Sequence, residues 1–347
     1  MKVYIASYQA ISILHGGPNT QIRNTIRFLP EFGVDARLFD QWSRFRKGDC
    51  DIVHIFAANI GTYHFAREIA SLGVPLVVSP IIYSRHSPQF MKRGLALTRI
   101  LQKVGPGIWS DYELCADICR WAEKVLPNTQ AEADLVVHGL DVPRDRILVI
   151  PNGVNSRFAS GDPSLFRQKY GLENFILNVG HIGHARKNVL KLIQALGTID
   201  HPAVIIGRFI PGPYGAACLR EAAKHKHILV IEGLDNDSDM LASAYAACDV
   251  FALPSLFETP GIAALEAGLA GAKLVITPYG GTTEYFGSHA TYVRPDSVSS
   301  IRDGIRLALA APKTDELRSS IQSRYLWQHV AGQTAAAYRS VLEKKGP

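Results

Sequence analysis

The chain has 347 residues, of which 47% are hydrophobic and 20% charged, which excludes a disordered protein and indicates a globular one of about two domains. The formal net charge of +6 is mild; it favours an anionic substrate or membrane surface but does not discriminate between these and nucleic acid. No window approaches eighteen uninterrupted apolar residues, so no membrane-spanning helix is expected.

Cysteine usage and the N-terminus both favour a cytoplasmic protein. The five cysteines form no Cys-x-x-Cys pair, and an odd, scattered set is typical of a reducing compartment. Cys115 and Cys119 lie one helical turn apart, which favours packing over metal binding. Residues 1–7 are β-rich and are followed by no clear cleavage site, so they predict a first strand and not a signal peptide.

The first half of the chain alternates predicted strands with predicted helices. Strands are expected at residues 1–7, 34–39, 52–56 and 75–80, and helices at 21–29 and 63–72. This alternation predicts a parallel, doubly wound sheet. His54, inside the third strand, is either a core histidine or a ligand, and the core interpretation is favoured.

A glycine loop follows the first strand. Gly16 and Gly17 precede Pro18-Asn19-Thr20 and the first predicted helix. Strand, glycine loop and helix together can bring the backbone close to a phosphate, although an ordinary tight turn explains the pattern equally well.

The alternation is interrupted at residues 87–124, which are helical in character and long for a crossover. Lys92, Arg99 and Lys103 fall on one helical face among many apolar residues. Such a helix can lie on an anionic membrane or bind an anionic acceptor, or it can present a solvated charged face above a packed apolar face. A helix at 129–138 and a strand at 145–150 follow, and the turn-rich residues 151–155 predict a domain junction.

The second half repeats the α/β pattern. Strands are expected at 174–179, 203–206, 227–231, 249–254 and 273–277, with a return to the sheet within 286–293. Helices are expected at 189–196, 214–225, 240–247, 261–271, 297–309 and 316–345.

Two glutamates in this half stand out. Glu258 lies in the turn after a predicted buried strand, and Glu266 is the only charged residue of the apolar helix that follows. A buried carboxylate is costly without hydrogen-bond donors, and a vicinal diol would supply two. The carboxyl ends of parallel strands are where open α/β sheets bind ligands, and a helix N-terminus suits a phosphate. The alternative is that both glutamates are salt-bridge partners that stabilise the fold.

The full set of motifs resembles the retaining glycosyltransferases of family 4, which have the GT-B fold. The resemblance is carried by the Glu258-x7-Glu266 spacing, by Gly180 with Lys187-Asn188, and by further motifs in the family's order: Gly16-Gly17, Pro151-Asn152-Gly153-Val154, and Gly280-Gly281 with Glu284. It implies two Rossmann-like domains facing across a cleft. Residues 1–155 would bind the acceptor, 156–326 would bind a nucleotide-diphospho-sugar, and 327–347 would cross back to the first domain.

The resemblance also implies roles for individual residues. Glu266 would accept hydrogen bonds from the ribose, Glu258 would face the donor sugar, and Lys187 would neutralise the leaving diphosphate. The donor site would further include Thr259, Gly261 and Ile262 around the helix N-terminus, Leu234 near the base, and Gly16 and Gly17 near the phosphates. The implied reaction retains the anomeric configuration, needs no metal and uses no cofactor beyond its UDP- or GDP-linked substrate.

Two departures from the family pattern concern charge and the acceptor. His181 stands where the family often has an arginine, and Arg186 could supply that charge instead. Ile81 stands where the family often has a histidine, and Tyr83 or His86 could take that place. The acceptor is expected to be a glycan or lipid-linked glycan, with transient contact at the inner face of an anionic membrane and no role for nucleic acid.

Three other functions stay open. Gly16-Gly17 and Asp40 would suit an NAD-dependent oxidoreductase, but this loop is not Gly-x-Gly-x-x-Gly. Ile81 would suit a catalytically weak nucleotide-sugar-binding protein. A sugar-nucleotide epimerase would keep the same fold.

Overall fold

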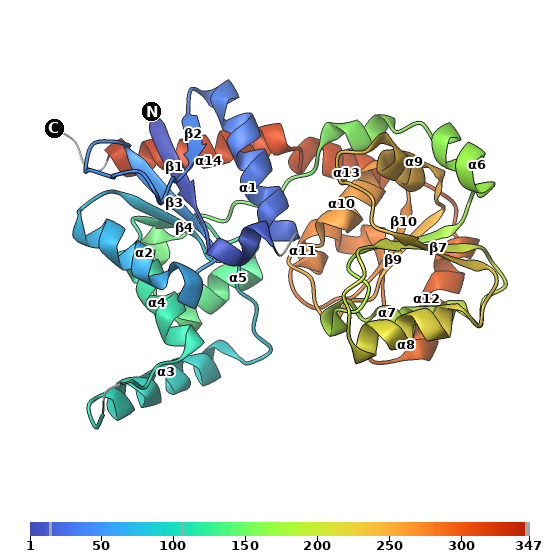
Figure 1. The fold of residues 1–347 in the computed structure, drawn as a ribbon, viewed down its shortest axis with the longest axis horizontal. Coiled ribbons are helices and arrows are strands. Elements are labelled where there is room, and N and C mark those ends of the chain that lie inside the picture. The colour runs from blue at the N-terminus through green and yellow to red at the C-terminus, as the bar shows by residue number, and fades with distance from the viewer. Residues whose placement is uncertain (14–15, 106, 344–347) are drawn as a thin grey trace. The chain divides into compact units, whose positions relative to one another are not determined.

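The computed structural model describes residues 1–13, 16–105 and 107–343, and the chain forms two compact units. Unit 1 comprises Met1–Gly153 and Trp327–Pro347, and unit 2 comprises Val154–Leu326 (Figure 1). Of the predicted crossover segment 327–347, residues 344–347 lie outside the described part.

Unit 1 is built on a five-stranded parallel sheet with the order β2-β1-β3-β4-β5. Its strands are β1 (Lys2–Ala6), β2 (Asp35–Leu38), β3 (Ile52–Phe56), β4 (Leu76–Ser79) and β5 (Lys124–Val125). Every residue of β3 and β4 is buried, as expected for parallel strands covered on both faces. The predicted parallel sheet is thereby confirmed.

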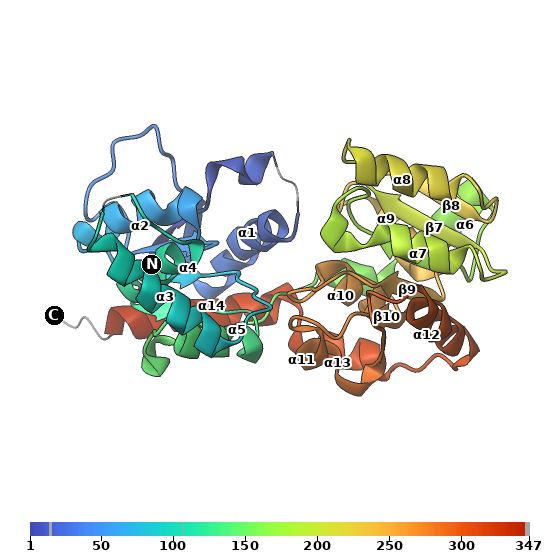
Figure 2. The ribbon, with the colours of Figure 1, turned by 90° about the horizontal axis from the view of Figure 1, so that it is seen from below.

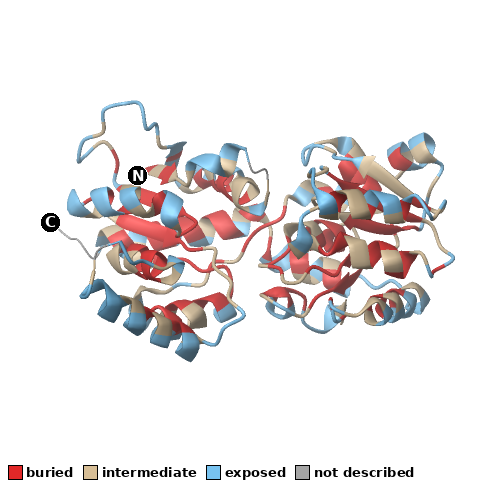
Figure 3. Ribbon diagram, turned by 60° about the horizontal axis from the view of Figure 1, so that its bottom comes forward, coloured by how far each residue is buried: buried red, intermediate tan, exposed pale blue. Residues whose placement is uncertain are grey.

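Helices cover both faces of this sheet. Those of unit 1 are α1 (Gly17–Phe28), α2 (Ile60–Ser71), α3 (Pro88–Gln102), α4 (Asp111–Trp121), α5 (Gln130–Asp134) and α14 (Trp327–Glu343). One apolar core joins the sheet to α2 and α4, and another joins it to α1 and α14. Figure 3 shows the same layering as buried strands beneath helices whose outer faces are exposed.

The last helix returns to unit 1 and is anchored in its core. The hydroxyl of Tyr338 on α14 lies 2.7 Å from Nδ1 of His54, and the other ring nitrogen lies 3.0 Å from Oγ of Ser79. Burial lowers the pKa of His54 to about 3, so its ring is neutral. His54 is therefore a core residue, and α14 packs on unit 1 through it.

The prediction of a strand at residues 145–150 is wrong. Arg144–Arg146 forms a 3-10 turn after Pro143, and only Ile147 forms an isolated bridge, with Val125. The segment does run beside the sheet edge, because the amide of Leu148 donates to the carbonyl of Val125 at 3.0 Å. It forms no regular strand because β5 is only two residues long and Pro127 follows it.

Unit 2 has a six-stranded parallel sheet with the order β11-β10-β9-β6-β7-β8. Its strands are β6 (Ile176–Val179), β7 (Ala203–Gly207), β8 (Ile228–Glu232), β9 (Val250–Leu253), β10 (Lys273–Ile276) and β11 (Ala290–Tyr292). In chain order the first strand, β6, lies beside the fourth, β9, which is the Rossmann arrangement. The order therefore reverses between β6 and β9.

Two layers of helices enclose this second sheet (Figures 1 and 2). The helices are α6 (Ser164–Tyr170), α7 (Val189–Leu196), α8 (Pro213–Ala222), α9 (Asp239–Ala247), α10 (Ile262–Leu269), α11 (Thr282–Phe286), α12 (Val298–Ala310) and α13 (Glu316–Arg324). One core contains side chains of α9, α10 and α13, and the opposite core contains those of α7, α8 and α12.

Candidate active site

The candidate site lies where the strand order of unit 2 reverses. Lys187 follows β6 in a short 3-10 turn (Ala185–Lys187), and Glu258 lies in the loop after β9. These strands are neighbours in the sheet, so their carboxyl-end loops meet. Crevices outside such reversal points are the usual ligand sites of open α/β sheets.

An ion pair joins the two loops. Nζ of Lys187 lies 2.6 Å from Oε1 of Glu258, and a guanidinium nitrogen of Arg186 lies 3.4 Å from the same oxygen. Arg186 also donates to the carbonyl of Phe257 at 3.0 Å and lies over its ring. The amide of Leu256 donates back to the carbonyl of Arg186 at 2.8 Å. Two cations, one carboxylate and a backbone link thus hold the loops together.

The charge state of Glu258 follows from this pairing. The residue is only 4% exposed, and burial by itself raises the pKa of its carboxyl group. The positive charges of Lys187 and Arg186, together with the hydrogen bond from Lys187, outweigh burial and lower the pKa overall. Glu258 is therefore ionised at neutral pH.

Gly280 positions Glu258 through the backbone. Residues 258 and 280 form a parallel bridge, in which the amide of Gly281 donates to the carbonyl of Glu258 at 2.9 Å. Gly280 has a φ of +99°, and a Cβ there would overlap the carbonyl oxygen of Glu258. Only glycine therefore allows this close approach. The Gly-Gly turn identified in the sequence thus supports the loop of Glu258.

The loop after β6 carries a cluster of basic residues. Burial is the main cause that lowers the pKa of His181, and the charges of Lys187, Arg208 and Arg186, with His184, lower it further. His181 is therefore neutral at pH 7, while Lys187 and Arg186 supply the positive charge. Such a cluster has the electrostatics of an anion site.

Glu266 is buried on α10, and each of its carboxylate oxygens has one protein donor. Its Oε1 accepts a hydrogen bond from Asn236 at 2.8 Å, and its Oε2 accepts one from the hydroxyl of Tyr245 at 2.7 Å. Burial raises the pKa of Glu266 to about 7, although both hydrogen bonds act in the opposite direction. Each carboxylate oxygen can accept a further bond, so a hydroxylated ligand could still join the two donors.

The other predicted donor residues are divided between the units. Thr259, Gly261 and Ile262 lie between Glu258 and α10, and Gly261 caps the helix with a φ of +87°. Leu234 is half-buried in the loop after β8, two residues before Asn236. Gly16 and Gly17 belong to unit 1, at the start of α1, where the carbonyl of Gly16 accepts from the amide of Thr20 at 3.1 Å.

Unit 1 has a large pocket where β3 and β4 end. The pocket encloses about 1040 Å³ and is lined by Ala57–Gly61, Pro80–Ser84, residues 8–10 and residues of α3 and α4. Ile81 and Tyr83 both line the pocket, and Ile81 has a φ of +53°. His86 does not line the pocket; it is exposed and stacks on Phe90 with ring centroids 4.4 Å apart. Of the two predicted acceptor-side residues, the pocket thus contains only Tyr83.

Sequence reasoning missed three residues that support these sites. Asn236 and Tyr245 hold Glu266, as described above. In unit 1, buried Glu132 accepts from the amides of Ile82 at 2.9 Å and Asn128 at 2.8 Å, which fixes the loop after β4. Glu132 could have been noticed because it follows the helix N-cap Thr129 by three residues, but its second partner is fifty residues away.

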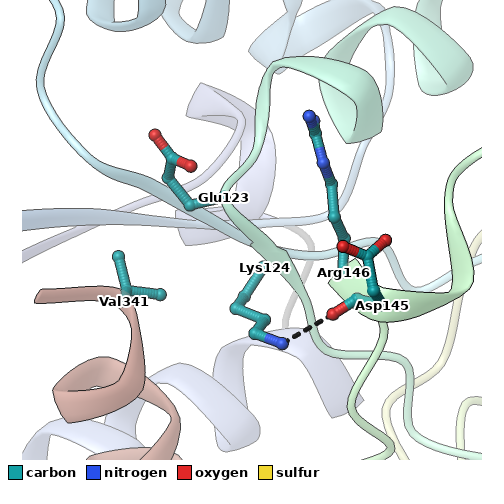
Figure 4. Close-up of a pocket in the computed structure, with 5 residues that line it drawn as sticks. All are labelled: Glu123, Lys124, Asp145, Arg146 and Val341. Carbon is teal, nitrogen blue, oxygen red and sulfur yellow. Dashed lines mark hydrogen bonds between the residues drawn. The ribbon is translucent and has the colours of Figure 1, made fainter. Parts of the chain in front are cut away.

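A smaller pocket of about 200 Å³ lies at the edge of unit 1, between Glu123, Lys124, Asp145, Arg146 and Val341. Figure 4 shows Lys124 donating to the carbonyl of Asp145, at 2.8 Å. None of the predicted site residues lines this pocket. Within the described parts of the chain, no group of three or more His, Cys, Asp or Glu side chains could hold a metal ion.

Comparison with known proteins places the chain among glycosyltransferase families. Residues 165–324 match the family model described as glycosyl transferases group 1, and residues 17–158 match the one described as glycosyltransferase family 4. An uncharacterized glycosyltransferase of Methanocaldococcus jannaschii is 28% identical over 68% of this chain and 63% of its own length. The MMP alpha-(1->4)-mannosyltransferase of Mycolicibacterium hassiacum is 25% identical over 86% of this chain and 72% of its own length. The chain thus spans somewhat less than two thirds of the length of the first of these relatives.

Solved structures show the same fold. The sucrose-phosphate synthase of Thermosynechococcus elongatus has a TM-score of 0.74 at 16% identity and covers 99% of both chains. An Anabaena protein, Alr3699/HepE, solved in complex with UDP, has a TM-score of 0.66 at 16% identity over 99% of both chains. With two parallel-sheet Rossmann-like units and both family models matched, the chain has the GT-B fold and belongs to the glycosyltransferase families described as group 1 and family 4.

Proposed function

We propose that this protein transfers a sugar from a nucleotide-diphospho-sugar to a hydroxyl group of a glycan or lipid-linked glycan, with retention of anomeric configuration. The observation that carries the proposal is the Lys187–Glu258 pair at the β6/β9 reversal point. The ammonium group of a lysine at that place can leave the carboxylate and contact a diphosphate. UDP bound to the structural neighbour named above supports a nucleotide-linked donor.

The residues of unit 2 would divide the donor between them. Lys187, with Arg186 beside it, would stabilise the negative charge that develops on the leaving diphosphate. Glu258 would face the donor sugar, with the backbone amides of Gly261 and Ile262 near the sugar or diphosphate. Glu266, Asn236 and Tyr245 would bind the ribose, and Leu234 would lie near the base.

The proposed chemistry is a front-face displacement without a metal ion. The bond between the anomeric carbon and the diphosphate oxygen breaks, and a bond to the acceptor oxygen forms on the same face. The proton of the acceptor hydroxyl passes to the leaving phosphate oxygen, so no separate general base is needed. Turnover that persists in EDTA and is not raised by added Mg²⁺ or Mn²⁺ would support this part.

The pocket of unit 1 would hold the acceptor. Among the described residues that line it, Asp111 is the only charged one, and Tyr8, Tyr83 and Tyr112 supply aromatic faces. This lining suits an uncharged, hydroxylated end of a glycan. The proposal places the reaction in the cytoplasm, with transient contact at the inner face of an anionic membrane.

The test is a screen of UDP- and GDP-linked sugars against mixed glycan acceptors, followed by mass spectrometry, for wild type and Glu258→Ala. We expect one donor to be consumed and its sugar to appear on an acceptor, with the donor's anomeric configuration in the NMR spectrum of the product. Glu258→Ala should abolish transfer.

Other results would identify the alternatives. Donor binding without transfer to any acceptor would indicate a nucleotide-sugar-binding protein, and interconversion of the donor sugar would indicate an epimerase. Thermal stabilisation by NAD(P) but by no nucleotide-sugar would indicate an oxidoreductase.

A further inference from the structure

Helix α3 has two apolar faces, and only one is packed. The helix begins after Ser87, whose hydroxyl accepts from the amide of Phe90 at 3.3 Å. Met91 and Leu95 are buried against the rest of unit 1. The opposite face, here called the outer face of α3, is 40–83% exposed and consists of Phe90, Leu97, Ile100, Leu101 and Val104.

This arrangement differs from the usual solvated charged face over a packed apolar face. Phe90, Leu97 and Leu101 recur at intervals of seven and four residues, so they project from one side of the helix. Ile108 and Trp109 extend the exposed apolar surface beyond the helix, at 39% and 53% exposure. Figure 1 shows α3 standing away from the sheet of unit 1.

The charged residues of α3 and its flanking segments are all basic. Residues 85–110 contain five Lys or Arg and no Asp or Glu. Lys92 pairs with Asp141 at 2.8 Å, whereas Arg93, Arg99 and Lys103 form no salt bridge with any described residue. Unpaired cations beside an exposed apolar strip, with a tryptophan at its end, are the features of a helix that lies in a membrane interface.

We propose that the outer face of α3 is the surface on which this protein docks to an anionic phospholipid membrane. The apolar side chains would enter the boundary between headgroups and acyl chains, and Arg93, Arg99 and Lys103 would contact anionic headgroups. In the part of the chain that the structure describes, no helix is long and apolar enough to cross a bilayer.

Charge favours a membrane over a second copy of this chain. In a symmetric contact between two outer faces, the same cations would meet each other across the interface. An anionic lipid surface neutralises them instead, at a gain of about fivefold in affinity for each Lys or Arg.

The docking surface also bears on the acceptor. Met91 of α3 lines the 1040 Å³ pocket of unit 1, so one helix carries both the membrane surface and part of the pocket wall. Given the proposed glycosyl transfer, this arrangement favours a lipid-linked acceptor over a free glycan. Docking itself does not depend on the transfer reaction and is measured without it.

The test is cosedimentation of the full chain with vesicles of phosphatidylglycerol and phosphatidylcholine, or of phosphatidylcholine alone. We expect binding to the anionic vesicles that weakens as salt is raised, and little binding to the neutral ones. Arg99→Gln/Lys103→Gln should weaken binding roughly twenty- to thirtyfold, and Leu97→Glu/Leu101→Glu should weaken it roughly tenfold or more for each leucine.

Matched controls exist in unit 2. Leu307→Glu changes an exposed leucine of α12, at 63% exposure compared with 57% for Leu97, and Arg220→Gln/Lys226→Gln removes two exposed cations. These variants should bind as wild type does. All of the substituted side chains are exposed, so circular dichroism should show every variant folded. A blue shift of fluorescence on vesicle binding that disappears in Trp109→Phe would place the α3 end in the interface.

Three results would overturn the proposal. The first is that wild type binds neither kind of vesicle, and the second is that the α3 variants bind as tightly as the unit 2 controls. The third is a dimer, seen by light scattering, that Leu97→Glu/Leu101→Glu dissociates while wild type binds no vesicles, which would assign the face to a second copy. A transferase that fails to bind vesicles would refute docking alone, and a vesicle-binding protein without transfer would refute the proposed function alone.

Discussion

Replacing Lys187 with methionine tests the ion pair at the centre of the site. The substitution removes an ammonium group 2.6 Å from Oε1 of Glu258 and leaves Arg186, at 3.4 Å, as the remaining cation. Because the side chain of Glu258 is only 6% exposed and that of Lys187 17%, solvent compensates little for the loss. Removing one partner of a buried pair costs about 3–5 kcal/mol. Since Arg186 remains, we expect about 2–3 kcal/mol.

The double variant isolates the interaction. Glu258→Gln alone leaves Lys187 and Arg186 without their carboxylate, whereas Lys187→Met/Glu258→Gln removes both the lysine charge and its partner. We expect the double variant to lose less unfolding free energy than the two single variants lose together, by about 1–3 kcal/mol. For a unit of this size, the single Lys187→Met change corresponds to a fall in melting temperature of about 5–10 °C.

The tryptophans allow the two units to be followed separately. Trp42, Trp109, Trp121 and Trp327 all belong to unit 1, and unit 2 contains none. Urea unfolding followed by tryptophan fluorescence should therefore be unchanged in these variants, while the far-UV circular dichroism transition of unit 2 shifts. A coupling energy below about 0.5 kcal/mol, or a shift seen in fluorescence instead, would refute the interpretation.

The same pair gives a pH dependence with a defined sign. The folded-state pKa of Glu258 lies below its ordinary value of 4.5, so the unfolded chain binds more protons at acid pH. The stability that the ionised carboxylate contributes is fully present above pH 4.5 and is lost as the pH falls through the folded-state pKa. The difference between wild type and Lys187→Met should therefore narrow below about pH 4.5. A difference that widens on acidification would contradict the assignment.

Two further variants probe Glu266 and Gly280. Glu266 has a pKa raised to about 7, so the folded chain holds a proton that the unfolded chain has lost, and wild-type stability should fall as pH rises from 4.5 to 7. This slope, worth about 3 kcal/mol in all, should disappear in Glu266→Gln when unfolding is measured across that range, and an unchanged slope would contradict the raised pKa. Gly280→Ala should cost more than about 2 kcal/mol, because its Cβ overlaps the carbonyl of Glu258. Gly271→Ala has a similar φ of +93° and open space, and should cost only about 1–2 kcal/mol, so equal costs in thermal melts would exclude the overlap.

The sequence predicted well the elements that bury apolar faces, and less well the short strands at the edges of the sheets. Residues of β3 and β4 could be predicted because Val, Ile and Leu runs of this length fit strands covered on both sides. The failure at residues 145–150 has a local cause, since a two-residue edge strand cannot support a regular ladder. The pattern of α3 predicted a helix but not which apolar face is packed, because that depends on neighbours distant in sequence.

The same distinction applies to the site. Glu258, Lys187 and Gly280 could be singled out because their motifs sit at strand ends, and the structure brings all three together. Tyr245 and Asn236 could not, because each reaches Glu266 only through the folding of separate loops onto α10. His86 and Tyr83, three residues apart, could not be told apart by sequence, and only Tyr83 lines the pocket.

In the proposed function, the β6/β9 reversal point of unit 2 binds a nucleotide diphosphate through Lys187. Titration calorimetry of UDP and GDP with wild type, Lys187→Met and the exposed-lysine control Lys226→Met tests it most directly. We expect one nucleotide to bind wild type and Lys226→Met alike, and Lys187→Met to raise the Kd at least about tenfold, the loss expected for a charged hydrogen-bond donor. Equal affinity in all three proteins, or binding of neither nucleotide to wild type, would contradict it.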